Sequence, residues 1–147
     1  MPASLPSQRR KARRCLVQAL YQWQVGGSSC HAVESQFHSD NRLSGADTKY
    51  FDELLRGVAT ATDELDNTFA AFLDRDIKAL DPVSLAILRI ATYELIYRID
   101  VPYRIAINEA INLAKTFGPT DAHKFINGVV DRVAAQTRKT EVAGSAD

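Results

Sequence analysis

The most evident chemistry in the sequence is a cluster of five cations near its start. The segment reads Arg9-Arg10-Lys11-Ala12-Arg13-Arg14, and no acidic residue precedes Glu34. Once helical, these side chains spread around the first turns, where each cation opposes the helix macrodipole at a cost of roughly a few tenths of a kcal/mol. Fold stability does not explain them, whereas phosphate contacts would, because each neutralised phosphate releases counterions. The alternative is that they only solubilise a frayed terminus.

Charge is segregated along the whole chain. The 147 residues carry no net charge, yet residues 1–33 carry +5, residues 34–103 carry −6 and residues 104–147 carry +1. A basic segment on an otherwise acidic body is typical of a protein that contacts a polyanion with one end. Composition alone leaves nucleic-acid binding and simple solubility as equal alternatives.

A second group of residues lies in the last predicted helix, which opens Asp121-Ala-His-Lys-Phe-Ile-Asn-Gly128. We expect Asp121 to cap this helix. Phe125 falls about 90° from the centre of the apolar stripe, so it is either packed at the edge of the core or a partly exposed contact. Gly128 costs about 1 kcal/mol relative to alanine inside a helix, and we expect another backbone to approach it closely.

No other pattern indicates catalysis. The sequence lacks a Gly-rich phosphate loop, an HExxH motif and a CxxC motif. Cys30, His31 and His38 have no fourth zinc ligand at a suitable spacing, so we predict neither a metal nor a cofactor. We interpret Asp74 and Asp76 as a solvated turn rather than an acid/base pair. The protein is therefore predicted not to be an enzyme.

The elements that must position these residues are all predicted to be helices. Apolar residues recur at spacings of three and four, without sustained alternation, so we predict an all-α fold of six or seven helices. The first helix is expected to start near Ser7 and the last to end near Ala135. Start signals occur at Asp47 and at Asp81-Pro82, where a capping residue precedes proline.

The predicted organisation has three parts. Residues 1–14 form a basic arm leading into the first helix, residues 7–136 a single helical domain, and residues 137–147 a disordered tail. No apolar run approaches the roughly 20 residues of a membrane span, and no secretory signal opens the chain. The two cysteines exclude a disulfide framework. We expect a cytoplasmic protein without membrane contact.

Four separated motifs resemble the NusB family of transcription antitermination factors. They are the Arg-rich start with Ala19-Leu-Tyr-Gln-Trp23, then Leu88-Arg-Ile-Ala-x-Tyr-Glu-Leu95, then Asp100-Val-Pro-Tyr-Arg-Ile-Ala-Ile-Asn-Glu-Ala-Ile-Asn-Leu-Ala-Lys-Thr-Phe-Gly118, and His123-Lys-Phe-Ile-Asn-Gly-Val-Val-Asp131. The resemblance implies two packed three-helix bundles. It also implies RNA-binding antitermination, in which the protein pairs with NusE, a ribosomal protein of the small subunit. The pair binds boxA in nascent rRNA transcripts and joins a termination-resistant RNA polymerase complex with other Nus factors.

The resemblance also implies site residues. Family RNA contacts are concentrated in the Arg-rich start, with further positions on the first and last helices. Thr120 departs from the family, which often has an acid there. The implied RNA-binding residues are Arg9, Arg10, Lys11, Arg13, Arg14, Tyr21, His123, Lys124 and Phe125. The implied NusE-facing residues are Glu94, Glu109, Asp121 and Phe125.

Two other functions remain as alternatives. One is a protein-only helical scaffold in which the basic arm is incidental. The other is a fragment of an rRNA cytosine methyltransferase, because certain of these enzymes begin with a NusB-like domain. We expect this second alternative to fail, since no cofactor-binding α/β portion follows the helical region.

Overall fold

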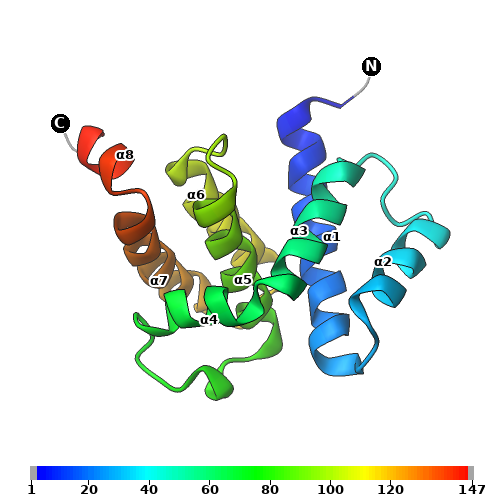
Figure 1. The fold of residues 1–147 in the computed structure, drawn as a ribbon, viewed down its shortest axis with the longest axis horizontal. Coiled ribbons are helices and arrows are strands. Elements are labelled where there is room, and N and C mark those ends of the chain that lie inside the picture. Colours follow the sequence, from blue (N-terminus) through cyan, green and yellow to red (C-terminus); the bar gives the residue numbers. More distant parts are fainter. Residues whose placement is uncertain (1–2, 146–147) are drawn as a thin grey trace. The chain divides into compact units, whose positions relative to one another are not determined.

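The computed structural model describes residues 3–145, and within that range it contains eight α-helices, one short 3₁₀ helix and no strand (Figure 1). The predicted all-α class is confirmed, with one α-helix more than the predicted maximum of seven. Contacts divide the chain into two units, one ending at Ala61 and one starting at Thr62. Among the described residues, no helix is long and apolar enough to cross a membrane.

The first unit is built from three helices, α1 (Leu5–Gly26), α2 (Cys30–Ser39) and α3 (Thr48–Thr60). Each follows a residue whose side-chain oxygen accepts a backbone N–H of the first turn: Ser4, Ser29 and Asp47, respectively. The helix α1 therefore starts two residues before the predicted position. The five cations lie inside its first three turns rather than in an arm, and residues 1–2 of the expected arm lie outside the described residues.

The core of the first unit is formed by the apolar faces of the three helices. The rings of Phe37 and Phe51 stack with centroids 5.5 Å apart, joining α2 to α3. The pattern of spacings of three and four explains this packing, since it places apolar residues on one face of each helix. The fully or almost fully buried apolar side chains of this unit include Leu16, Leu20, Val33, Phe37, Phe51, Leu54, Leu55 and Val58.

The central helix of the second unit is α5 (Pro82–Tyr97). It contacts α4 (Thr62–Ala70), α6 (Tyr103–Phe117) and α7 (Ala122–Thr137). Asp81 Oδ2 accepts the N–H of Ser84 at 2.9 Å, which confirms the start signal predicted at Asp81-Pro82. Arg89 donates two hydrogen bonds to Asp66 of α4, from Nε at 2.9 Å and Nη2 at 2.8 Å. The short helix η1 (Ile77–Ala79) lies between α4 and α5.

The first unit is one of the two three-helix bundles that the resemblance implied, and in the second unit α5, α6 and α7 pack against one another. The second unit adds α4 and α8 (Lys139–Gly144) to α5, α6 and α7. The predicted single domain over residues 7–136 is thus divided into two contact units, and its last residues are continuous with a further helix.

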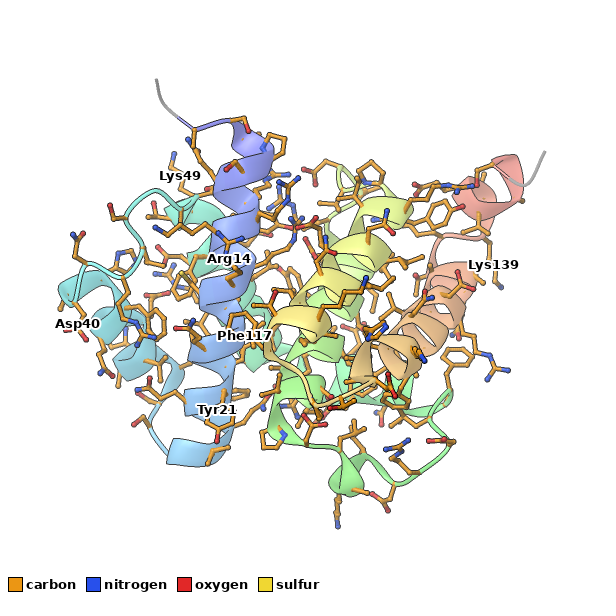
Figure 2. The ribbon with its side chains drawn as sticks, turned by 180° about the vertical axis from the view of Figure 1, so that it is seen from behind. Arg14, Tyr21, Asp40, Lys49, Phe117 and Lys139 are labelled. Atoms are coloured by element: carbon orange, nitrogen blue, oxygen red, sulfur yellow. The ribbon has the colours of Figure 1, made fainter. Side chains whose placement is uncertain are left out.

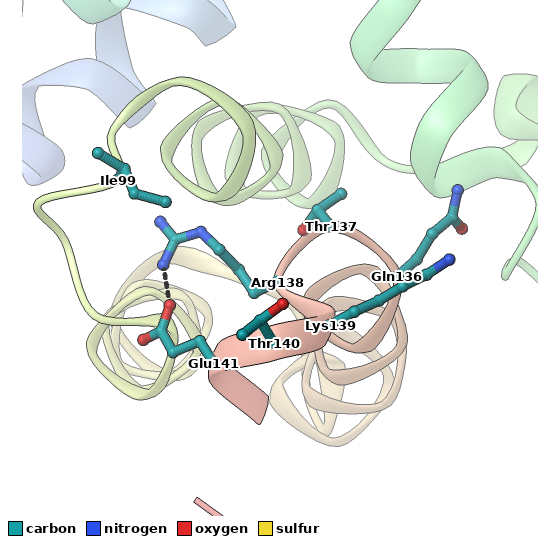
Figure 3. Close-up of a pocket in the computed structure, with 7 residues that line it drawn as sticks. All are labelled: Ile99, Gln136, Thr137, Arg138, Lys139, Thr140 and Glu141. Carbon is teal, nitrogen blue, oxygen red and sulfur yellow. Dashed lines mark hydrogen bonds and ion pairs between the residues drawn. The ribbon is translucent and has the colours of Figure 1, made fainter. Parts of the chain in front are cut away.

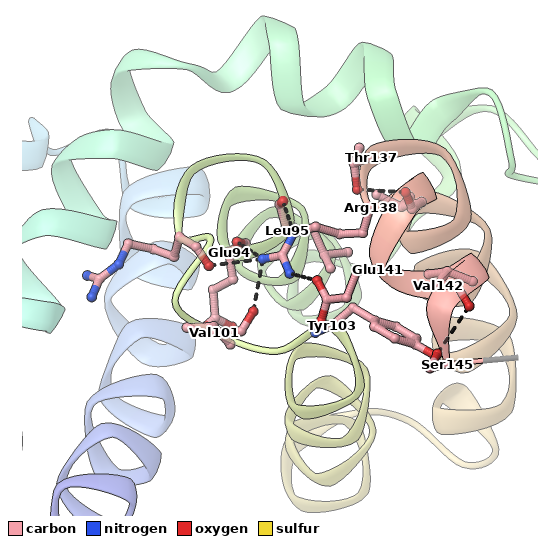
Figure 4. A network of polar contacts seen from close by, with 11 residues as sticks. Glu94, Leu95, Val101, Tyr103, Thr137, Arg138, Glu141, Val142 and Ser145 are labelled. Atoms are coloured by element: carbon pink, nitrogen blue, oxygen red, sulfur yellow. Dashed lines mark hydrogen bonds and ion pairs between the residues drawn. The ribbon is translucent and has the colours of Figure 1, made fainter. Parts of the chain in front are cut away.

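The disordered tail expected over residues 137–147 is not what the structure shows. Thr137 ends α7, α8 follows at once, and only residues 146–147 of the tail lie outside the described residues. The ordering group is Arg138, which is 4% exposed and enters the core rather than the solvent. Its guanidinium donates to four backbone carbonyls between 2.8 and 3.2 Å away (Figure 4), those of Glu94, Leu95, Arg98 and Val101.

Glu141, on α8, completes this network. Its Oε2 accepts the N–H of Tyr103 at 2.9 Å, and its Oε1 accepts a hydrogen bond from Arg138. The Tyr103 and Ser145 hydroxyl oxygens lie 2.6 Å apart. In the neighbouring pocket, Arg138 and Glu141 form one side, while Gln136 and Lys139 extend toward the other (Figure 3). The segment is ordered because its polar groups satisfy backbone groups at the ends of α5 and α6.

Candidate nucleic-acid interface

Arg9, Lys11 and Arg13 of the N-terminal cluster make contacts within the first unit. Arg9 Nε lies 3.7 Å from an Asp47 oxygen, and its guanidinium lies 4.6 Å from the centroid of the Tyr50 ring. Arg13 lies 5.5 Å from the same ring and is only 3% exposed. Lys11 donates to the Ser44 carbonyl. These contacts fix α1 against α3 and the loop before it. Arg13 is thus a buried member of the predicted RNA-binding set, and its role stays a prediction.

The other two cations lie on an exposed face of α1. A helix advances 100° per residue, which places Arg10, Arg14 and Tyr21 within about 40° of one another. All three side chains are exposed, and Tyr21 is 44% exposed despite its size. Figure 2 shows Arg14 and Tyr21 along this helix. We call the exposed face the α1 stripe; it comprises Arg10, Arg14, Gln18, Tyr21 and Val25.

The start of α7 holds the other predicted RNA-binding residues. Asp121 and Lys124 are exposed, with Lys124 Nζ 3.7 Å from Asp121 Oδ1, while His123 and Phe125 are half-buried. Asp121 does not cap the helix as predicted: its φ is +65°, and its side chain makes no capping hydrogen bond. A side-chain cap needs extended backbone at that position, whereas Asp121 takes the left-handed conformation.

Phe125 has a partner that the sequence did not reveal. The guanidinium of Arg75 lies 4.5 Å from the centroid of the Phe125 ring. Arg75 also donates from Nε to Asp74 Oδ1 at 2.8 Å, and this hydrogen bond holds the pKa of the Asp74 carboxyl below its usual range. The segment after α4 therefore brings a planar cation onto the aromatic ring of α7. Arg75 and Phe125 are 50 positions apart, so no local pattern could have found the pair.

A groove of about 210 Å³ lies beside this pair. Along α7 its lining residues are spaced at three, four and seven positions, which places them on one helical face. We call it the Phe125 groove; it is lined by Phe72, Asp74, Lys124, Phe125, Gly128, Val129 and Arg132.

The surroundings of Gly128, in the Phe125 groove, differ from the prediction that another backbone packs closely against it. A Cβ built on it meets no heavy atom of the described residues within 4 Å, and the residue is exposed. No neighbouring backbone approaches it closely. The glycine therefore leaves open space on the surface of α7, instead of making room for a packed helix.

Two of the three acids predicted to face NusE are buried. Glu94 is 1% exposed and Glu109 is 8% exposed. Both lie on sides of α5 and α6 that include core residues, so neither carboxylate is presented on an acidic docking surface. Asp121 is the exposed acid among the residues predicted to face NusE.

The described residues contain no group of three or more histidine, cysteine, aspartate or glutamate side chains arranged to hold a metal ion. Cys30 Sγ donates weakly to the Leu55 carbonyl at 3.7 Å, and burial raises the pKa of its thiol. The Phe125 groove and the α1 stripe combine cations with aromatic rings. Other proteins use cations beside aromatic rings to contact phosphates and unpaired bases.

A model of the NusB family matches residues 10–135. The chain belongs to the NusB family. It is 53% identical over 135 residues to the transcription antitermination protein NusB of Saccharophagus degradans. The matched region covers 91% of this chain and 90% of that relative. It is 52% identical over 136 residues to the NusB of Pseudomonas savastanoi pv. phaseolicola, covering 92% and 82%.

The fold agrees with a solved NusB structure. The NusB of T. maritima superposes with a TM-score of 0.79 at 26% identity, covering 97% of this chain and 99% of that one. The curated NusB relatives are named transcription antitermination proteins, which are not enzymes, so the prediction of a non-enzyme is confirmed by family membership. Neither of these two is named a methyltransferase.

Proposed function

We propose that this NusB-family chain is an RNA-binding transcription antitermination factor. It would bind boxA in nascent rRNA transcripts together with NusE and act as an adaptor in a termination-resistant RNA polymerase complex. The observation that carries the proposal is the α1 stripe, where Arg10, Arg14 and Tyr21 share one exposed face. Family membership supports the same function.

The spacing of the α1 stripe suits a single strand. A rise of 1.5 Å per residue puts Arg10 and Arg14 about 6 Å apart along the helix, and Tyr21 about 10 Å beyond Arg14. The two cations would neutralise phosphates, and the tyrosine ring would stack on an unpaired base. Arg9, Lys11 and Arg13 would act indirectly, since their contacts with Asp47, Tyr50 and Ser44 hold α1 in place.

The placement of NusE changes with the structure. Because Glu94 and Glu109 are buried, we do not place the NusE contact on these two residues. The start of α7 is retained, since Asp121 is exposed and Phe125 is half-buried there. We therefore assign the NusE contact to this edge of the second unit.

The proposal is tested by fluorescence anisotropy with a labelled boxA RNA and a scrambled control, with and without NusE, at two salt concentrations. Arg14→Glu should weaken boxA binding strongly. Lys49→Glu makes the same charge change at an exposed site of the first unit outside the α1 stripe and should have a much smaller effect. Tyr21→Ala should lose more affinity than Tyr21→Phe.

The contrary result is equally definite. Equal, weak and salt-sensitive binding to both RNAs, unchanged by NusE and by Arg14→Glu, would reject the boxA adaptor. The protein-only scaffold would then be the better description.

A further inference from the structure

Arg42 lies in the loop between α2 and α3 and is an exposed cation outside the N-terminal cluster. Its guanidinium lies 3.9 Å from the centroid of the buried Phe37 ring, so the side chain lies along the surface of the core. Its Nη2 donates a hydrogen bond to Oε1 of Gln18, a member of the α1 stripe. Arg42 therefore places one more positive charge directly beside the surface proposed to bind RNA.

The loop that carries Arg42 is also fixed to α1 through its backbone. Cys15 Sγ donates weakly to the Arg42 carbonyl at 3.6 Å. At the end of the loop, the N–H of Asp47 donates to the Gln8 carbonyl at 3.0 Å. Since the loop is held at Arg42 and again at Asp47, the guanidinium is already ordered in the free protein. A ligand would therefore bind it at a small cost in side-chain entropy.

Arg42 belongs to a group of three cations, with Lys11 and Arg14, on one side of α1. Lys11 and Arg14 share a helical face with Gln18, because the three are spaced at three, four and seven positions. Burial raises the pKa of the nearby Cys15 thiol, whereas all three cations act to lower it, so each of them lies close to the sulfur. We call this surface the Arg42 edge; it comprises Lys11, Arg14, Gln18 and Arg42.

The loop also contains two acids, Asp40 and Asp47. Asp40 lies at the outer end of α2, away from Arg14 on α1 (Figure 2). Asp47 lies 3.7 Å from Arg9 and caps α3. The sequence of α1 itself contains no acidic residue. The Arg42 edge therefore carries more positive than negative charge, which suits a polyanion.

We propose that Arg42 binds a backbone phosphate of the RNA, so that the strand passes from the α1 stripe onto the loop between α2 and α3. One face of the guanidinium lies on the Phe37 ring, which leaves its N–H edge for the ligand. Arginine N–H groups match phosphate oxygens in a bidentate arrangement. The inference rests on the proposed RNA-binding function and extends its surface to a residue outside all the motifs that resemble the family.

The test compares Arg42→Met with the wild-type protein. Methionine keeps an unbranched chain over the Phe37 ring and removes only the charge, so the variant should melt close to the wild-type temperature. The matched control is Lys49→Met, which removes one positive charge from an exposed site at the start of α3. The full-length proteins are titrated by fluorescence anisotropy against labelled boxA RNA and the scrambled control at several salt concentrations.

One phosphate contact has a defined dependence on salt. Its loss from a complex with single-stranded nucleic acid lowers the slope of log K against log[salt] by about 0.7. Between about 50 and 200 mM salt, the affinity of Arg42→Met should therefore fall about 2.5-fold less than that of the wild type. At the lower salt concentration it should bind both RNAs about two- to fivefold more weakly, because a phosphate contact carries no sequence information. Lys49→Met should match the wild type.

A scan of the RNA backbone locates the contact. Each phosphate is replaced in turn by an uncharged methylphosphonate. At one linkage this change should weaken wild-type binding about two- to fivefold and leave Arg42→Met unaffected. Arg42→Lys keeps the charge and should remain sensitive at the same linkage. Arg14→Gln should also remain sensitive there, since its own phosphate lies elsewhere on the strand.

Several results would overturn the inference. An unchanged salt slope of Arg42→Met, with Arg14→Glu still impaired, would reject the phosphate contact and leave the proposed function standing. An equal loss in Lys49→Met would show a general effect of charge. Weaker NusE binding with unchanged RNA binding would make the Arg42 edge a protein contact. If the wild-type protein bound no RNA at all, the proposed function itself would fail, and this contact with it.

Discussion

Arg138 and Glu141 form one ion pair that closes both ends of the α5–α6 connection. The arginine donates to carbonyls in the last turn of α5 and in the loop that follows, and the glutamate accepts the N–H of Tyr103 at the start of α6. Helix α6 has Pro102 at its N-cap and no side-chain cap of its own. Arg138 and Glu141 therefore supply the hydrogen-bond partners that the backbone groups at the end of α5 and the start of α6 do not find within the connection.

Removing the arginine should destabilise the protein strongly. Arg138→Ala leaves several buried carbonyls without their donor, and we expect a loss of about 3 kcal/mol or more in the free energy of unfolding. Arg138→Lys keeps the charge but cannot span the same carbonyls, so it should lose a substantial part of that amount. Chemical denaturation followed by circular dichroism measures both. Near-wild-type stability of Arg138→Ala would contradict the capping role.

The Glu141 contact predicts a pH dependence. The N–H of Tyr103 and then the ion pair with Arg138 lower the pKa of Glu141 from its ordinary 4.5. Since the folded state holds the proton less tightly than the unfolded state, the contribution is complete above pH 4.5 and is lost as the pH falls through the lowered value. Glu141→Gln should therefore melt below the wild type at neutral pH, and the gap should narrow in acid. A constant gap would exclude this linkage.

Two aspartates at helix starts should respond oppositely to substitution. Asp81 caps α5, so Asp81→Ala should cost about 1 kcal/mol. Asp121 makes no cap and has a φ of +65°, so Asp121→Gly should be neutral or stabilising by up to about 1 kcal/mol because glycine adopts this conformation without strain. Parallel thermal melts of the two variants decide the matter. A loss for Asp121→Gly as large as that for Asp81→Ala would show a hidden capping role.

Two glycines provide a similar contrast. A Cβ on Gly118 would lie 2.7 Å from the Ala114 carbonyl oxygen and 3.2 Å from the Ala122 Cβ, so Gly118→Ala should destabilise by about 1–3 kcal/mol. A Cβ on Gly128 meets nothing, and Gly128→Ala should stabilise α7 by about 0.5–1 kcal/mol. Differential scanning calorimetry would test both. A larger loss of stability for Gly128→Ala than for Gly118→Ala would contradict both predictions.

The sequence predicted those parts of the fold whose causes are local. Asp47 and Asp81 start helices because each accepts an N–H three residues later, a relationship visible in a short window. Asp121 has the same residue type but lies inside a turn in which the Ala122 N–H donates to the Pro119 carbonyl, and this turn sets its backbone. Arg138 was assigned to a tail because its partners lie 37 to 44 positions earlier.

The candidate site was predictable as a region and less so residue by residue. Which cations of α1 remain exposed depends on Tyr50 and Asp47, far along the chain, and the resemblance carried no information on that burial. The same holds for Glu94, whose position matched the family while its side chain lies in the core. Residue type is written in the sequence, whereas exposure results from the packing of distant segments.

The location of Arg138 also orders events during protein synthesis. The C-terminal end of α5 leaves the ribosome about 40 residues before Arg138, which at roughly 5–20 residues per second is a delay of roughly 2–8 s. The first unit has emerged completely before α5 begins. Nascent chains should therefore acquire a protease-resistant first unit early, while the α5–α6 connection stays susceptible until the arginine arrives.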